Sequence, residues 1–143
     1  MPFVPEILLA EDNPADVYLI RESLKEHGIA CPLQVASDGR EVLDLIGAGQ
    51  SPSIHQFGLI ILDLNLPRHD GIEILERLKR SANMAHVPVV VLTSSDSPQD
   101  RLNATNLGAC RYLRKPSSLE DFLNLGAVFK EVLTDNCTLG ASE

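Results

Sequence analysis

Short apolar runs alternate with longer amphipathic stretches five times along the chain. The apolar runs lie at residues 7–10, 33–36, 59–62, 87–92 and, with a weaker pattern, 111–113. The third run and most of the fourth contain no polar position, which is typical of strands buried on both faces of a parallel sheet. The pattern therefore predicts five strands in one parallel sheet.

The amphipathic stretch after each run carries signals of a helix. Asn13-Pro14-Ala15-Asp16 supplies an N-cap residue, a proline in the first turn and an acidic residue, and Gly28 follows the expected end of that helix. Ser97-Pro98 repeats the cap and the proline, and Ser118 begins the last helix. The second and third helices are predicted at residues 40–46 and 71–80.

Five consecutive strand–helix units predict an α/β fold, a doubly wound five-stranded parallel sheet flanked by five helices. We expect residues 1–143 to form one domain, with a core at 6–133 and a short tail at 134–143. The polar segment 47–56 is a long connection for this architecture. Ligands of such sheets bind beyond the carboxyl ends of the strands, so the residues that follow the strands decide the function.

Composition and charge exclude several classes of function. The chain has 143 residues, of which 44% are hydrophobic and 22% charged, as in an ordinary domain with a core. Twenty acidic residues against 12 basic ones give a net charge of −8, which disfavours binding to nucleic acid or to an anionic membrane. No apolar run is long enough to span a bilayer, and the first residues lack the basic segment of a signal peptide. We expect a cytoplasmic protein whose three separated cysteines, Cys31, Cys110 and Cys137, are reduced.

Polar side chains follow four of the predicted strands. Glu11 and Asp12 follow the first, Asp63 ends the third, Thr93 follows the fourth and Lys115 follows the fifth. Crowded carboxylates need a cation or a shared proton, and ligand sets made only of oxygen select a hard ion, here Mg²⁺ with Mn²⁺ as a substitute. A carboxylate beside such an ion can accept a phosphoryl group, whose charge the metal, a lysine and a hydroxyl group stabilise.

These residues resemble the receiver domains of two-component response regulators. The resemblance covers about residues 6–133 and is carried by Glu11-Asp12-Asn13, Asp63, Pro67, Asp70-Gly71, Thr93-Ser94, Gly108-Ala109, Tyr112 and Lys115-Pro116. It implies the flavodoxin-like receiver fold with strand order 2-1-3-4-5. It also implies a phosphorylation-activated switch that is phosphorylated by a sensor histidine kinase. Such a switch promotes only its own phosphorylation and dephosphorylation, and we expect it to have no output domain of its own.

The resemblance implies a role for each acidic residue at the strand ends. Asp63 would be the phosphoacceptor. Asp12, Asp63 and the backbone carbonyl of Asn65 would ligate Mg²⁺ directly, and Glu11 would act largely through a bound water.

The resemblance also implies roles on the opposite side of the site. Thr93 and Lys115 would contact phosphoryl oxygens, and Tyr112 would turn inward as a switch when Thr93 moves towards the phosphate. The Lys115–Pro116 bond resembles a cis peptide of the family that would aim the lysine.

A closer resemblance is to the stand-alone receivers that partner bacterial and cyanobacterial phytochromes. It is carried by Asn13-Pro14-Ala15-Asp16, by the long connection at 47–56 and by Leu64-Asn65-Leu66-Pro67. It implies a bacterial phytochrome as the partner kinase. His69 stands where methionine is frequent in the family, which leaves the choice of partner open and does not affect the chemistry.

Three other functions compete with this interpretation. A flavin-binding protein of the same fold needs a phosphate loop after the first strand, but Glu11-Asp12-Asn13-Pro14 is anionic. A phosphohydrolase with an aspartyl nucleophile usually has a second acid two residues later, where this chain has Asn65. A degenerate receiver that only binds other proteins would normally have lost an acid or the lysine, and this chain keeps them all.

The last predicted helix has a wider apolar arc than packing on a sheet requires. A helical wheel places Phe122, Gly126 and Phe129 towards the sheet and Leu125, Val128 and Val132 on the adjoining flank. The resembled family dimerises through its fourth helix, fifth strand and fifth helix. We therefore predict a homodimer with Leu125, Val128 and Val132 at the interface.

Overall fold

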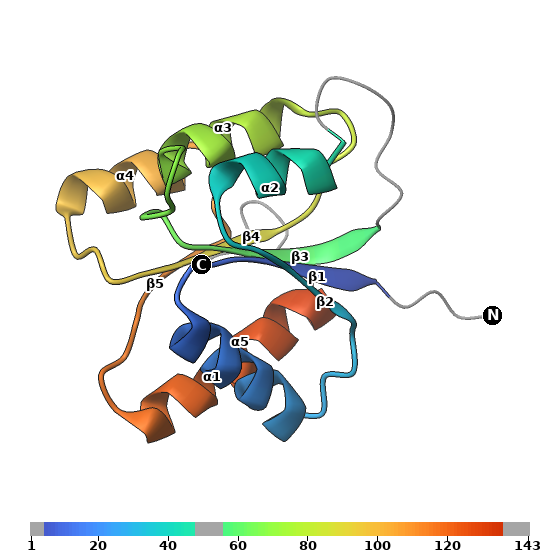
Figure 1. The fold of residues 1–143 in the computed structure, drawn as a ribbon, viewed down its shortest axis with the longest axis vertical. Helices are drawn as coiled ribbons and strands as arrows, with labels where there is room; N and C mark the ends of the chain where they lie inside the picture. The colour runs from blue at the N-terminus through green and yellow to red at the C-terminus, as the bar shows by residue number, and fades with distance from the viewer. Residues whose placement is uncertain (1–4, 48–55, 136–143) are drawn as a thin grey trace.

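The computed structural model describes residues 5–47 and 56–135, which form a parallel sheet with helices on both faces (Figure 1). The strands are β1 (Glu6–Ala10), β2 (Leu33–Ala36), β3 (Phe57–Leu62), β4 (Val89–Thr93) and β5 (Arg111–Arg114). The helices are α1 (Pro14–Glu26), α2 (Gly39–Leu45), α3 (Gly71–Arg80), α4 (Pro98–Asn106) and α5 (Leu119–Asp135). The sheet order is β2-β1-β3-β4-β5 and all its pairs are parallel. The expected fold class and strand order are confirmed.

The central strands separate two hydrophobic cores. Side chains alternate across a strand, so neighbouring residues of β4 enter different cores: Val91 packs under α2, α3 and α4, whereas Val90 packs under α1 and α5. Every residue of β4 is buried. This double burial explains why the apolar runs of the central strands lack polar positions.

Capping residues begin four of the helices, including the predicted Asn13 and Ser97. Asn13 accepts hydrogen bonds from the backbone N–H groups of Ala15 and Asp16 at the start of α1. Asp38, Asp70 and Ser97 cap α2, α3 and α4 in the same way. The observed ends differ from the predicted ones by up to two residues, as at β3 and at the end of α5. Most of the predicted connection at 47–56 and of the tail at 134–143 lies outside the described residues.

The predicted interface flank of α5 is wrong for two of its three residues. Leu125 is 8% exposed and Val132 is 1% exposed, and both belong to the core beneath α1 and α5, while Val128 is half-buried against the same core. The reason is that α5 packs against two neighbours. Gly126 lies so close to Ser23 of α1 that a Cβ atom would meet its carbonyl oxygen. A helix buried against both a sheet and a second helix needs a wide apolar arc.

The cysteines also differ in part from the expectation. Cys31 is a free thiol, but Cys110 is disulfide-bonded, so reduced cysteines are confirmed only at Cys31. Cys137 lies outside the described residues.

In the described ranges, no helix combines the length and the hydropathy that a membrane span needs.

Candidate functional site

The carboxyl ends of β1, β3, β4 and β5 place the predicted site residues at one edge of the sheet. Glu11, Asp63 and Thr93 are 2%, 4% and 0% exposed, and they make up three of the four buried polar residues in the described ranges. Polar groups at such burial need partners, because an unpaired one costs free energy. Their partners therefore define the site.

The Lys115 ammonium joins carboxylates from three elements. Its Nζ atom lies 2.8 Å from Glu11 Oε1, 2.9 Å from Asp63 Oδ2 and 2.8 Å from Asp16 Oδ2 in the first turn of α1. The backbone N–H of Lys115 donates to the Thr93 carbonyl at 2.8 Å, which fixes the lysine beside the end of β4.

Burial and the charges of this cluster shift the pKa of two groups. Burial lowers the pKa of Lys115, but its hydrogen bonds with the three carboxylates outweigh burial and raise the pKa above its ordinary value of 10.5. Burial raises the pKa of Glu11 above 4.5, and the negative charge of Asp63 adds to this, although Lys115 acts in the opposite direction. The lysine is therefore a permanent cation, whereas Glu11 takes up a proton more readily than an ordinary glutamate.

Glu11, Asp12 and Asp63 form a cluster suited to a metal ion. One carboxylate oxygen of each lies within 4.8 Å of the other two. Glu11 and Asp63 are buried and Asp12 is exposed, so the cluster opens to solvent on the Asp12 side. An oxygen-only set that is open to water fits Mg²⁺, which keeps several of its water ligands. The backbone N–H of Asn65 donates to Asp63 Oδ1 at 3.0 Å and orients this carboxylate.

Thr93 and Tyr112 are connected through the segment that follows β4. Thr93 Oγ1 accepts hydrogen bonds from Asn65 Nδ2 and from the backbone N–H of Ser95, each at 3.3 Å. The Tyr112 hydroxyl donates to the Ser95 carbonyl at 3.3 Å, and the Arg101 guanidinium lies 4.8 Å from the centre of the tyrosine ring. The hydroxyl group at the site and the predicted switch residue thus share Ser95 as a partner.

The Lys115–Pro116 bond departs from the family resemblance. None of the peptide bonds in the described ranges is cis, including this one. The trans isomer is the lower-energy form of most bonds before proline, and Lys115 is aimed at the site by its three carboxylate partners.

Asp16 is the site residue that sequence reasoning missed. In the sequence, Asp16 serves only as one of the signals that mark the start of the first helix. No further signal was present, because Asp12 precedes the N-cap Asn13 and helical spacing does not extend to it, so only the fold brings Asp16 to Lys115. The described structure brings together all the predicted acidic, hydroxyl and lysine residues and adds Asp16 to them.

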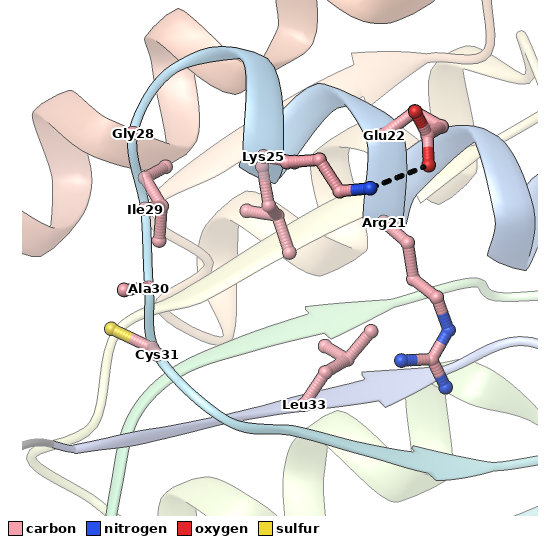
Figure 2. Close-up of a pocket in the computed structure, with 9 residues that line it drawn as sticks. Arg21, Glu22, Lys25, Gly28, Ile29, Ala30, Cys31 and Leu33 are labelled. Carbon is pink, nitrogen blue, oxygen red and sulfur yellow. Dashed lines mark ion pairs between the residues drawn. The ribbon is translucent and has the colours of Figure 1, made fainter.

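A cavity lies away from this edge of the sheet, at the other end of α1. It has a volume of about 490 Å³, and Figure 2 shows its lining by the end of α1 and the segment that leads to β2. The Lys25–Glu22 ion pair, at 3.6 Å, lies at its wall, and Cys31 and Leu33 line it. None of the strand-end residues takes part in it.

Comparison with known proteins identifies the family. The model of the response regulator receiver domain matches residues 7–125. The chain belongs to this family. Receiver domains are phosphoacceptor switches of two-component signalling and relay signals from histidine kinases, and this function is that of the chain.

Two curated relatives are similar over most of their length. The probable methanogenesis regulatory protein FilR2 of Methanothrix harundinacea is 36% identical over 91% of this chain and 83% of its own. Response regulator Rcp1 of Synechocystis is 34% identical over 95% of this chain and 93% of its own. The receiver domain thus accounts for most of each relative.

Solved structures agree with the fold and with the metal. The phosphorylated cyanobacterial phytochrome response regulator RcpA has a TM-score of 0.83 at 31% identity, covering 97% of this chain and 100% of its own. The Mn²⁺-bound form of Rcp1 has a TM-score of 0.82 at 34% identity, covering 96% and 99%. The receiver domain of a Pseudomonas aeruginosa sensor histidine kinase, with a TM-score of 0.71 at 25% identity, holds Mg²⁺ in its active-site cleft and covers 94% of this chain and 98% of its own. The cluster of Glu11, Asp12 and Asp63 in this chain is suited to such an ion.

Proposed function

We propose that Asp63 accepts the phosphoryl group of a sensor histidine kinase. The observation that carries this proposal is the surroundings of the Asp63 carboxylate, which is buried between the Lys115 ammonium and the N–H of Asn65. The same carboxylate belongs to the acidic cluster with Glu11 and Asp12. A carboxylate can serve as the nucleophile that forms an aspartyl phosphate, and the ammonium beside it can stabilise charge on the incoming phosphoryl group.

The reaction transfers one phosphoryl group between two proteins. A carboxylate oxygen of Asp63 forms a bond to phosphorus, the bond between phosphorus and the imidazole nitrogen of the kinase breaks, and the imidazole leaves with the electron pair. Lys115 and Thr93 donate to phosphoryl oxygens in this arrangement. Water later cleaves the acyl phosphate, which releases inorganic phosphate and restores the carboxylate of Asp63.

Glu11, Asp12, Asp63 and the backbone carbonyl of Asn65 would hold Mg²⁺. When bound, the ion neutralises charge on the carboxylates and on the phosphoryl oxygens. Glu11 and Asp12 provide the negative charge that keeps it at this edge of the sheet.

The switch proposal concerns Thr93 and Tyr112. Thr93 Oγ1 accepts from Asn65 and Ser95 with its two lone pairs, so its O–H is left to donate to a phosphoryl oxygen. A movement of Thr93 towards that oxygen would change the geometry of both accepted bonds. Because Ser95 is also bound by the Tyr112 hydroxyl, this change alters the tyrosine and the face formed by α4, β5 and α5. That face would carry the signal to a partner.

The test is Mg²⁺-dependent labelling with acetyl phosphate. We expect wild type to incorporate acid-labile phosphate and Asp63→Asn to incorporate none, with unchanged circular dichroism, since the substitution preserves the size of the side chain. Undiminished labelling of Asp63→Asn would contradict the assignment. Wild type that takes up no phosphate would instead be a receiver that only binds other proteins. We propose that the chain does not turn over foreign substrates, so hydrolysis of unrelated phosphate esters is expected to stay at the buffer level.

A bacterial phytochrome in the cytoplasm is the kinase partner that we propose. The resemblance of the chain to the phytochrome response regulators supports this choice of kinase. The net charge of −8 separately disfavours nucleic acid and membrane surfaces as partners. The test is phosphotransfer from a panel of purified histidine kinases, in which a phytochrome kinase is expected to transfer fastest. Equal rates from all kinases would contradict this choice.

The homodimer remains a prediction. Its interface excludes the buried Leu125 and Val132, whereas the exposed Leu102 of α4 lies on the proposed face. Light scattering of wild type and of Leu102→Glu, with and without phosphorylation, tests it. A monomeric mass for wild type in both states would contradict the homodimer.

A further inference from the structure

The Lys115 ammonium has no hydrogen-bond donor to spare. An ammonium carries three N–H bonds, and three carboxylate oxygens lie at 2.8, 2.8 and 2.9 Å from Nζ, one each from Glu11, Asp16 and Asp63. Glu11 and Asp63 belong to the metal cluster, whereas Asp16 does not. The negative charge of Asp16 is therefore balanced by Lys115 rather than by the metal.

Phosphorylation changes what Lys115 has to bind. The acyl phosphate removes the charge of the Asp63 carboxylate but adds phosphoryl oxygens that carry nearly two negative charges. Asp16 and Asp63 both contact Nζ, at 2.8 and 2.9 Å, so their oxygens lie close enough for strong repulsion between Asp16 and the phosphoryl group. The side chain of Asp16 is only 18% exposed, so water screens this repulsion weakly.

We propose that Asp16 is a positioning residue that holds Lys115 in the unphosphorylated state and competes with the phosphoryl group for its ammonium. This inference rests on the proposed role of Asp63. Asp16 keeps the lysine beside the acidic cluster and lowers the affinity of the site for a phosphoryl group. The residue thus favours the unphosphorylated state of the switch.

The test is the affinity for beryllofluoride, a non-covalent mimic of the phosphoryl group, measured by calorimetry at saturating Mg²⁺. Asp16→Asn keeps the size of the side chain and one oxygen acceptor but removes the charge. We expect its Kd to be at least about fivefold lower than that of wild type, because the repulsion is lost. The matched control is Glu26→Gln, the same change of charge at an exposed position of the same helix, which is expected to leave the Kd unchanged.

Asp16→Ala provides a second variant if Asp16→Asn does not fold, and its Kd is expected to fall as well. If Asp16 acts only as an acid at the start of α1, its variants lose thermal stability and keep the wild-type Kd, which would overturn the inference. A raised Kd would overturn it too. Asp63→Asn separates the two proposals: binding of beryllofluoride that survives this substitution overturns the role of Asp63, whereas its loss together with unchanged Asp16 variants overturns only the role of Asp16.

Discussion

At the scale of single residues, the site depends on one cation and its carboxylates. Lys115 contacts acids that come from the end of β1, the end of β3 and the first turn of α1. Ion pairs that are mostly removed from water are expensive to break, because the remaining charges stay buried. The same lysine therefore serves both the stability of this edge of the sheet and the binding of phosphoryl oxygens.

The raised pKa of Glu11 predicts a pH dependence of Mg²⁺ binding. A protonated carboxyl group is a poor metal ligand. Because burial raises the pKa of Glu11 above 4.5, Mg²⁺ affinity is full above this raised pKa and falls as the pH decreases through it. Calorimetric titrations with Mg²⁺ from mildly alkaline to mildly acidic pH measure this. Glu11→Gln, uncharged throughout, is expected to bind more weakly and with a shallower pH dependence, and equal slopes for both proteins would refute the role of Glu11.

At the scale of elements, α5 is buried on two sides. Its core residues face the sheet and α1, and Gly126 allows the close approach to Ser23. At its N-terminal end, Leu119 is 61% exposed. The side chains of α5 therefore differ strongly in burial, from the core residues to the exposed Leu119.

Substitutions on α5 test this contrast by urea unfolding. Phe129 is fully buried, so Phe129→Ala is expected to lower the free energy of unfolding by about 3–5 kcal/mol. Leu119→Ala serves as the matched control and is expected to change it by less than about 0.5 kcal/mol. A comparable loss for both variants would mean that the burial of α5 is described incorrectly.

The sequence predicted the elements well but not the surroundings of every helix. The apolar runs located all five strands, and Asn13 and Ser97 marked helix starts, because caps and periodicity are local properties. The interface flank of α5 was misjudged, and Asp16 was missed. Both depend on contacts with α1 or Lys115, and such contacts between distant parts of the chain leave little trace in local pattern.

At the scale of the whole molecule, the net charge of −8 is concentrated in part at one edge of the sheet. A ligand that binds only the folded state stabilises it by mass action. Mg²⁺ therefore couples the charge of the site to the stability of the entire domain.

Thermal unfolding with and without Mg²⁺ measures this coupling. At a concentration about ten times its Kd, Mg²⁺ is expected to add roughly 1.4 kcal/mol to the free energy of unfolding of wild type. Asp12→Ala is expected to lose most of this gain and, without Mg²⁺, to be at least as stable as wild type because like charges are relieved. Asp44→Ala, an exposed acid of α2, is expected to retain the full gain. An undiminished gain in Asp12→Ala would place the metal elsewhere.

Every polar atom of Ser95 forms a hydrogen bond, and the backbone and the side chain contact different parts of the molecule. Its N–H and carbonyl bind Thr93 and Tyr112, whereas its hydroxyl donates to Asp100 of α4 at 2.8 Å and accepts from the N–H of Ser97. The path from the threonine to the tyrosine therefore needs no particular side chain at this position. Replacing Ser95 with alanine would keep that path and remove the hydroxyl contact with α4, while α4 would stay joined to the tyrosine through Arg101.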